Sequence, residues 1–235
     1  MDNQTRLKQT AARQALSLVE DGMTLGLGTG STTWFFVQFL GEALQQGQLK
    51  NIRCVPTSEN TARHARDLGI PLVPLDDVQW LDLAVDGADE VAPDLSMIKG
   101  LGKALLREKL VEIHARQLWI IVDESKLVRR LGEHVPLPVE IVPFAHGATL
   151  RWLNSLPDCR AELWLKEDGT PWVTDNEHYL VLCRFDNGIT DPEKLGRNLN
   201  DWPGVMEHGL FLDMATGVIV ASEQGVRVLG QNDQF

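Results

Sequence analysis

This 235-residue sequence lacks long apolar runs, a surplus of positive charge and an N-terminal pattern typical of a signal peptide. No apolar run approaches the ~18 residues that a membrane span requires, so we expect no membrane association. The formal net charge of −11 argues against nucleic acid as a partner, because binding to phosphate backbones requires a basic surface. The first residues show no basic stretch followed by an apolar one, so we expect no signal peptide.

Disulfide and metal motifs are also missing. Cys54, Cys159 and Cys183 are far apart and form no C-x-x-C pair. They indicate buried thiols in a reducing compartment, so we expect a cytoplasmic protein. None of the six histidines stands at metal-ligand spacing from another histidine or a cysteine. We therefore expect neither a metal site nor a cofactor.

Apolar runs and helical periodicity alternate over the first half of the chain, with glycine or aspartate between them. The runs predict strands over residues 23–27, 51–55, 70–73, 81–85 and 118–122. The periodic segments predict helices over residues 5–20, 34–44, 58–68 and 99–116, the third with Ser58 as its N-cap. This alternation predicts an α/β fold in which a doubly wound, Rossmann-like sheet is mostly parallel.

The pattern changes near the Pro-Leu-Pro sequence at 136–138. Further on, the order of predicted elements is β-α-β-β-α-β with a hairpin arm, which is typical of a small ferredoxin-like α+β domain. The strands are predicted over residues 139–142, 161–165, 179–184 and 205–212, and the helices over residues 147–156 and 191–199. Two final strands, 217–221 and 226–229, are expected to rejoin the first layer.

These patterns predict two domains. We expect a catalytic Rossmann-like domain from residues 1–132 and 213–235, and a small domain from residues 133–212. We further expect a homodimer or homotetramer formed through the small domain. Trp164 and Trp172 flank the arm, where large aromatic side chains suit a subunit contact.

A glycine-rich segment, Gly-Thr-Gly-Ser-Thr-Thr at 28–33, lies between the first predicted strand and the helix that follows. Backbone N–H groups and the helix dipole at such a position favour an anion. Ser31 stands where a dinucleotide fingerprint requires glycine, and the segment lacks the lysine of a nucleotide P-loop. Two interpretations remain at this point: a cradle for a compact monophosphate, or a capped turn that binds nothing.

A second segment, residues 85–109, concentrates charged groups between glycines. Asp86 and Asp89 follow an apolar strand, Lys99 lies before a helix, and Glu108 lies on that helix beside its apolar stripe. Partial desolvation there would strengthen the Glu108 carboxylate as a base. Without further information, solvated surface charge explains the same residues equally well.

Taken together, these motifs resemble the ribose-5-phosphate isomerase A family, in family order over nearly the whole chain. The first matching motifs are Gly-Thr-Gly-Ser-Thr (28–32), Val-Asp-Gly-Ala-Asp-Glu (85–90) and Met-Ile-Lys-Gly-x-Gly-x-Ala-Leu-x-Arg-Glu-Lys (97–109). The later ones are Asp-x-Ser-Lys (123–126), Pro-Leu-Pro-Val-Glu (136–140), Val-Thr-Asp-Asn (173–176), Pro-Gly-Val (203–205) and Gly-Leu-Phe (209–211).

The resemblance implies an isomerase that interconverts D-ribose 5-phosphate and D-ribulose 5-phosphate through an enediolate. It implies that Glu108 is the general base and acid, that Asp86 and Asp89 act on substrate hydroxyls and ring opening, and that Lys99 stabilises the oxyanion. It also implies a set of substrate-binding residues: Lys8, Gly28, Thr29, Gly30, Ser31, Thr32, Gly100, Gly102 and Lys126.

One residue departs from the family within the second segment. The family pattern there is Lys-Gly-Gly-Gly, and Leu101 replaces the middle glycine, where a side chain narrows the space for substrate. Three alternatives stay open: another phosphosugar isomerase or deaminase, a phosphosugar-sensing domain, and a degenerate paralogue. A sensor of that kind is expected to carry an N-terminal helix-turn-helix, and only about 20 residues precede the first predicted strand.

Overall fold

The computed structural model describes residues 2–230, and these residues divide into two compact units. The larger unit comprises residues 1–88, 107–126 and 213–235, and the smaller comprises residues 89–106 and 127–212. Residues 89–106 and 127–132, which the sequence analysis assigned to the catalytic domain, therefore pack with the smaller unit. The reason is a short three-stranded sheet, in which the strand at 97–98 pairs with 90–91 on one side and with 210–211 on the other.

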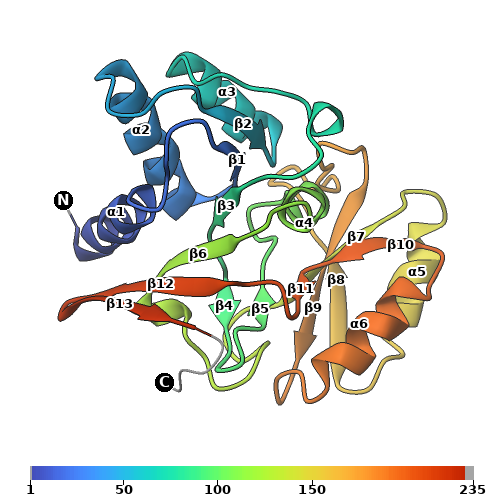
Figure 1. The fold of residues 1–235 in the computed structure, drawn as a ribbon. Helices are drawn as coiled ribbons and strands as arrows, with labels where there is room; N and C mark the ends of the chain where they lie inside the picture. Colours follow the sequence, from blue (N-terminus) through green and yellow to red (C-terminus); the bar gives the residue numbers. More distant parts are fainter. Residues whose placement is uncertain (1, 231–235) are drawn as a thin grey trace. The chain divides into compact units, whose positions relative to one another are not determined.

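The larger unit is built on a six-stranded sheet in the order β13-β12-β6-β3-β1-β2 (Figure 1). The strands are β1 (Thr24–Leu27), β2 (Arg53–Pro56), β3 (Leu83–Asp86), β6 (Leu118–Asp123), β12 (Gly217–Ser222) and β13 (Gly225–Leu229). All neighbours run parallel except β12 and β13, which form an antiparallel hairpin. The predicted mostly parallel sheet is confirmed.

Helices cover both faces of this sheet. They are α1 (Asn3–Leu16), α2 (Ser31–Gln45), α3 (Glu59–Asp67) and α4 (Leu105–Glu112), the last of which crosses between the units. Successive β1 side chains alternate in direction: Leu25 and Leu27 enter the core formed with α1 and α2. Gly26 points the other way, where an added Cβ would lie 2.9 Å from Val111 Cγ1 of α4. The fold is therefore doubly wound, as predicted.

The smaller unit contains a four-stranded antiparallel sheet in the order β10-β7-β9-β8. Its elements are β7 (Leu137–Ile141), α5 (His146–Leu153), β8 (Cys159–Leu163), β9 (Tyr179–Phe185), α6 (Pro192–Asn200) and β10 (Val205–His208). This β-α-β-β-α-β order and pairing confirm the ferredoxin-like prediction. A second sheet, β11-β5-β4, joins Leu210–Phe211, Met97–Ile98 and Glu90–Val91.

Two predicted elements were wrong in part. The segment 70–73 is not a strand, because it makes only an isolated bridge between Leu72 and Cys54. The helix predicted over residues 99–116 is confined to α4, because Gly100 (φ +106°) and Lys103 (φ +70°) hold non-helical backbone before it. Two short 3₁₀ turns, η1 (Leu75–Asp77) and η2 (Glu124–Lys126), complete the described elements.

All three cysteines are buried and free, as the sequence predicts. Within residues 2–230, no helix combines the length and apolarity that a membrane span requires.

The buried carboxylate of Glu90 organises the smaller unit beside β4. Its side chain is 1% exposed, and it accepts backbone N–H bonds from Gly132 (2.6 Å), His134 (2.6 Å) and Val135 (2.9 Å). Charged acceptors make the stronger hydrogen bonds, and a buried donor left without one is costly. The segment 132–135 therefore depends on this one side chain.

We predict that Glu90→Ala lowers the free energy of unfolding by about 3 kcal/mol, because three backbone N–H groups lose one charged acceptor together. Urea denaturation would measure the change. Glu162→Ala, on an exposed position of β8, is the matched control and should stay within about 0.5 kcal/mol of the unchanged protein. Equal losses in the two variants would contradict the anchoring role of Glu90.

Candidate active site

The glycine-rich segment lies where the strand order of the larger sheet reverses. From β1 the chain moves to β2 on one side and then to β3 on the other, so β1 and β3 are adjacent. Ligands of open α/β sheets bind beside the carboxyl ends of strands at such a switch point. Gly28 follows β1 there, and Asp86 ends β3. The fold thus brings together two predicted site residues 58 positions apart in sequence.

Contact between Gly28 and Asp86 is so close that only glycine fits. A Cβ at residue 28 would lie 2.0 Å from Asp86 Cγ. Oδ1 of Asp86 accepts the N–H groups of Thr29 (3.0 Å) and Gly87 (2.6 Å) and the hydroxyl of Thr33 (3.1 Å). With 1% exposure, Asp86 is nearly excluded from water. Its carboxylate therefore fixes the shape of the glycine loop.

The start of α2 is suited to hold an anion. Its N-cap is Gly30 (φ +142°), and no side chain in residues 2–230 caps it. The first N–H groups of any helix lack intrahelical acceptors, and the helix dipole adds partial positive charge there. Gly30 and Ser31 are exposed and Thr32 is half-buried, so this helix start is open to solvent.

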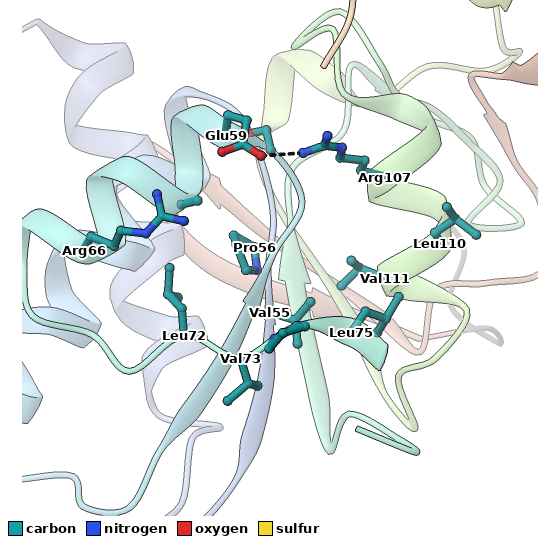
Figure 2. A pocket seen from close by; sticks show the side chains of 13 residues that line it. Val55, Pro56, Glu59, Arg66, Leu72, Val73, Leu75, Arg107, Leu110 and Val111 are labelled. Atoms are coloured by element: carbon teal, nitrogen blue, oxygen red, sulfur yellow. Dashed lines mark hydrogen bonds and ion pairs between the residues drawn. The ribbon is translucent and has the colours of Figure 1, made fainter. Parts of the chain in front are cut away.

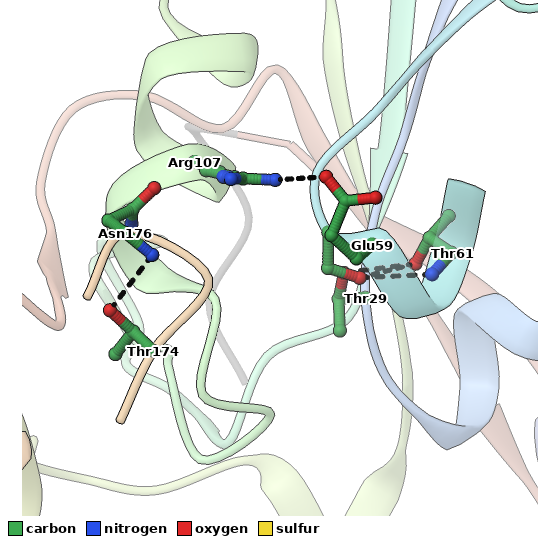
Figure 3. Close-up of polar contacts among 7 residues, drawn as sticks. Thr29, Glu59, Thr61, Arg107, Thr174 and Asn176 are labelled. Atoms are coloured by element: carbon green, nitrogen blue, oxygen red, sulfur yellow. Dashed lines mark hydrogen bonds and ion pairs between the residues drawn. The ribbon is translucent and has the colours of Figure 1, made fainter. Parts of the chain in front are cut away.

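The hydroxyl of Thr29 belongs to a cluster that sequence reasoning missed. It lies 2.7 Å from Thr57 Oγ1, 2.8 Å from Ser58 Oγ and 3.0 Å from Thr61 Oγ1 at the start of α3 (Figure 3). The Thr61 hydroxyl in turn donates to the carbonyl of Gly28 at 2.9 Å. Only Ser58 carried a sequence signal, as a predicted helix cap, which it is. Thr29 thus ties the glycine loop to α3.

Lys8 and Lys126 lie on two separate elements of the larger unit, α1 and η2. Lys126 lies in η2, directly after the carboxyl end of β6, and is half-buried. Lys8 is half-buried in the second turn of α1. The start of α1 is fastened at this edge, because the Asn3 amide donates to Glu223 (2.8 Å) in the turn after β12. Lys126 and the start of α1 therefore lie at the edge of the sheet that carries the glycine loop.

Glu108 is a buried carboxylate of the larger unit. It lies one turn into α4 and is 2% exposed. A carboxylate in the first turn of a helix interacts favourably with the positive end of the dipole. The sequence prediction that Glu108 borders the apolar stripe of this helix agrees with buried Leu105 and Val111 on either side of it.

The smaller unit holds the other predicted pair, Asp89 and Lys99. Glu90 stands opposite Ile98 in the β4–β5 register, which brings Asp89 beside Lys99 one step further along. The Lys99 side chain is 1% exposed, and its Nζ lies 5.2 Å from the centre of the Phe211 ring. Burying an ammonium is costly, so a fold that retains one has specific interactions for it.

The loop after Lys99 is held by Asp89. Oδ2 of Asp89 accepts the N–H of Leu101 at 2.9 Å, and Gly100 (φ +106°) allows this turn. A Cβ at Gly100 would also lie 2.8 Å from Leu105 Cβ. Gly102, also predicted to bind substrate, is exposed. The hydrogen bond to Asp89 comes from the backbone N–H of residue 101, so it forms with leucine at this position as it would with the glycine of the family pattern.

A separate cavity of about 490 Å³ lies in the larger unit among β2, α3, α4 and the segment 72–75 (Figure 2). Its walls are mainly aliphatic, including Val55, Leu72 and Val111, and the ion pair between Glu59 and Arg107 (2.9 Å) lies at one end. None of the residues predicted for the site lines it. In the described part of the chain, no cluster of His, Cys, Asp and Glu side chains could hold a metal ion.

Comparison with known proteins gives one consistent family. Residues 53–225 match the sequence model described as ribose 5-phosphate isomerase A (phosphoriboisomerase A). A ribose-5-phosphate isomerase A from Synechococcus sp. (strain JA-3-3Ab) is 48% identical over 99% of this chain and 100% of its own length. One from Gloeobacter violaceus is 51% identical over 95% of each chain.

Solved structures similar to this chain belong to the same family. A D-ribose-5-phosphate isomerase in complex with phospho-erythronic acid superposes with a TM-score of 0.94 at 42% identity, covering 97% of this chain and 100% of that one. The ribose 5-phosphate isomerase of Plasmodium falciparum superposes with a TM-score of 0.93 at 35% identity, with the same coverage.

We predict that Gly28→Ala weakens the binding of inorganic phosphate at least about tenfold, equivalent to 1.4 kcal/mol, because the new Cβ displaces Asp86 and the loop that it holds. Isothermal titration would measure the affinity. Gly47→Ala is the control, because its added Cβ meets no atom of the described chain within 4 Å; Gly47, unlike Gly28, has a positive φ (+69°) that strains an alanine. That variant should lose about 1 kcal/mol of stability and keep its phosphate affinity.

Proposed function

The chain belongs to the ribose 5-phosphate isomerase A family, and we propose that it interconverts D-ribose 5-phosphate and D-ribulose 5-phosphate with Glu108 as the proton-transferring group. One observation carries this proposal: the larger unit contains two features that the reaction requires. The first is the uncapped start of α2, which is suited to bind a phosphate, and the second is the carboxylate of Glu108, which is 2% exposed and suited to proton transfer. The interconversion is a step of the non-oxidative pentose phosphate pathway.

The reaction moves one proton between neighbouring carbons. Glu108 removes the proton from C2 of the open-chain aldose, and the carbonyl oxygen on C1 becomes negative as the enediolate forms. A proton then passes from the hydroxyl on C2 to the oxygen on C1, and Glu108 returns its own proton to C1, so that C2 becomes the carbonyl carbon of the ketose. Burial suits this role, because a carboxylate with few water contacts is a stronger base and exchanges its proton less readily with solvent.

The ammonium of Lys99 is proposed to stabilise the negative oxygen. A preorganised cation in a water-excluded position is worth far more than the same cation in water. Two observations support this role: Lys99 is almost fully buried, and its backbone is fixed by a hydrogen bond from its N–H to the carbonyl of Gly209 (2.9 Å).

The two aspartates are proposed to differ in role. Asp89 is only partly buried, so its carboxylate remains accessible for exchanging protons with substrate hydroxyls and assisting ring opening. Asp86 has three donors on one oxygen, which supports a role in holding the phosphate loop as well as in catalysis. The phosphate is anchored by the segment Gly28–Thr32 together with Lys8 and Lys126, and this anchor holds the reacting carbons in register.

The ligand of the superposed D-ribose-5-phosphate isomerase supports this substrate class. Phospho-erythronic acid carries a phosphate at one end and a planar carboxylate at the other. That carboxylate resembles the planar, negatively charged enediolate, and analogues of such species bind tightly to enzymes.

We also propose that the protein is cytoplasmic and acts as a homodimer or homotetramer through its smaller unit. The buried free thiols support a reducing compartment. On the arm between β8 and β9, Leu165 is 50% exposed and Val173 is 44% exposed, which supports a subunit contact there.

We expect Glu108→Gln to lower kcat by about 10²- to 10⁴-fold, because an amide cannot accept the proton, while KM changes little. Formation of ketose from ribose 5-phosphate in the presence of a chelator would measure it. Glu112→Gln, one turn further along α4 and also buried, is the matched control. Turnover by Glu108→Gln at the control's rate would remove Glu108 from its role.

Replacing Leu101 by glycine tests the departure from the family pattern. Since the bond from residue 101 to Asp89 is made by backbone, we expect kcat to change less than about threefold. A rise in kcat/KM of more than about threefold would show instead that the leucine side chain obstructs the substrate. Steady-state kinetics with ribose 5-phosphate decides between these results.

A further inference from the structure

The loop that carries Lys99 ends at Lys103, whose ammonium lies against two indole rings. Lys103 Nζ is 3.4 Å from the centre of the Trp172 ring and 5.0 Å from that of Trp164. Both distances are within the ~6 Å range in which a cation is attracted to the face of an aromatic ring. All three residues belong to the smaller unit.

The two indoles are held by a regular hairpin. The N–H of Trp172 donates to the carbonyl of Trp164 (2.8 Å), and the N–H of Trp164 donates to the carbonyl of Leu180 (2.8 Å). Leu165 and Pro171 form an antiparallel bridge further along the arm. Paired residues of antiparallel strands place their side chains on the same face. The arm therefore presents both rings together before any contact with the loop.

The backbone of Lys103 is strained. Its φ of +70° is a left-handed conformation that costs a residue with a Cβ roughly 1 kcal/mol or more. In this conformation its N–H donates to the carbonyl of Gly100 at 2.9 Å, which closes the turn that follows Lys99. Partial burial also lowers the pKa of Lys103. Contact with the indole faces offsets both costs.

We propose that Lys103 is a positioning residue, whose ammonium is clamped by Trp164 and Trp172 and thereby fixes the loop that carries Lys99. The proposal rests on the proposed function, since the loop positions groups for that reaction. Lys103 itself need not touch the substrate. It acts through the turn that aligns the Lys99 backbone and presents the N–H of Leu101 to Asp89.

Kinetics of Lys103 variants test the proposal. We expect Lys103→Met to lower kcat roughly fivefold, the effect of losing a contact of about 1 kcal/mol, with KM changed less than about twofold because the phosphate is held elsewhere. Lys103→Arg keeps the cation and should restore most of kcat. Lys166→Met is the matched control, because Lys166 Nζ lies 6.0 Å from the same Trp172 ring but outside the loop.

A glycine variant separates the contact from the strain. Lys103→Gly adopts φ +70° without cost, so its thermal stability should equal or exceed that of the unchanged protein. If the clamp positions the loop, its kcat falls as in Lys103→Met despite that stability. Trp172→Leu should cause little further loss when combined with Lys103→Met, because the two residues act as a pair. Wild-type kcat and KM in both Lys103→Met and Lys103→Gly would overturn the proposal.

Amide hydrogen exchange of residues 99–105 reports the position of the loop without any turnover. Exchange should be faster in Lys103→Met and Lys103→Gly than in Lys103→Arg or Lys166→Met. Equal exchange in all four variants would overturn the clamp. The two proposals can fail separately. If the unchanged protein does not isomerise ribose 5-phosphate but the exchange rates differ as expected, the proposed function is wrong, whereas the role of Lys103 in fixing the loop is still supported.

Discussion

The close contact between Gly28 and Asp86 is the constraint on which the larger unit depends. Parallel strands β1 and β3 are neighbours, so their carboxyl ends meet, and one oxygen of Asp86 binds two backbone N–H groups and a hydroxyl of the following loop. This bonding leaves no room for a side chain at residue 28. It also determines where α2 begins, and with it the direction of the uncapped helix start. The same contact therefore shapes the sheet edge and the loop proposed to hold the phosphate.

Much of this arrangement could be predicted from sequence because its signals are local. Apolar runs bounded by glycine marked the strands of the parallel sheet, and the alternation with helices gave its topology. The β-α-β-β-α-β order of the smaller unit was likewise readable from periodicity. Glycines and charged residues after buried strands drew attention to the two segments of predicted site residues, but their roles came from the resemblance to the family and not from the local pattern.

The remaining features depend on contacts between distant residues. Ser58 was predicted as a helix cap, but its bond to Thr29 joins two loops that sequence spacing does not relate. The strand predicted over residues 70–73 had the right composition and lacked a full partner. Lys103 was predicted as part of a helix. In the structure its backbone is left-handed and lies in a turn, and its side chain contacts Trp172. The short pairing of β5 with β4 and β11, which places residues 89–106 in the smaller unit, also could not be predicted from a local pattern.

The order of strands along the chain has a consequence for synthesis on the ribosome. In the larger sheet β12 pairs with β6, although the residues between them include most of the smaller unit. The sheet stays incomplete until residues 217–222 have emerged, whereas β7 to β10 of the smaller unit are complete by residue 208. Contacts between distant segments form slowly because closing a long loop costs entropy. The smaller unit can therefore fold during translation, while one edge of β6 stays unpaired until residues 217–222 have been synthesised.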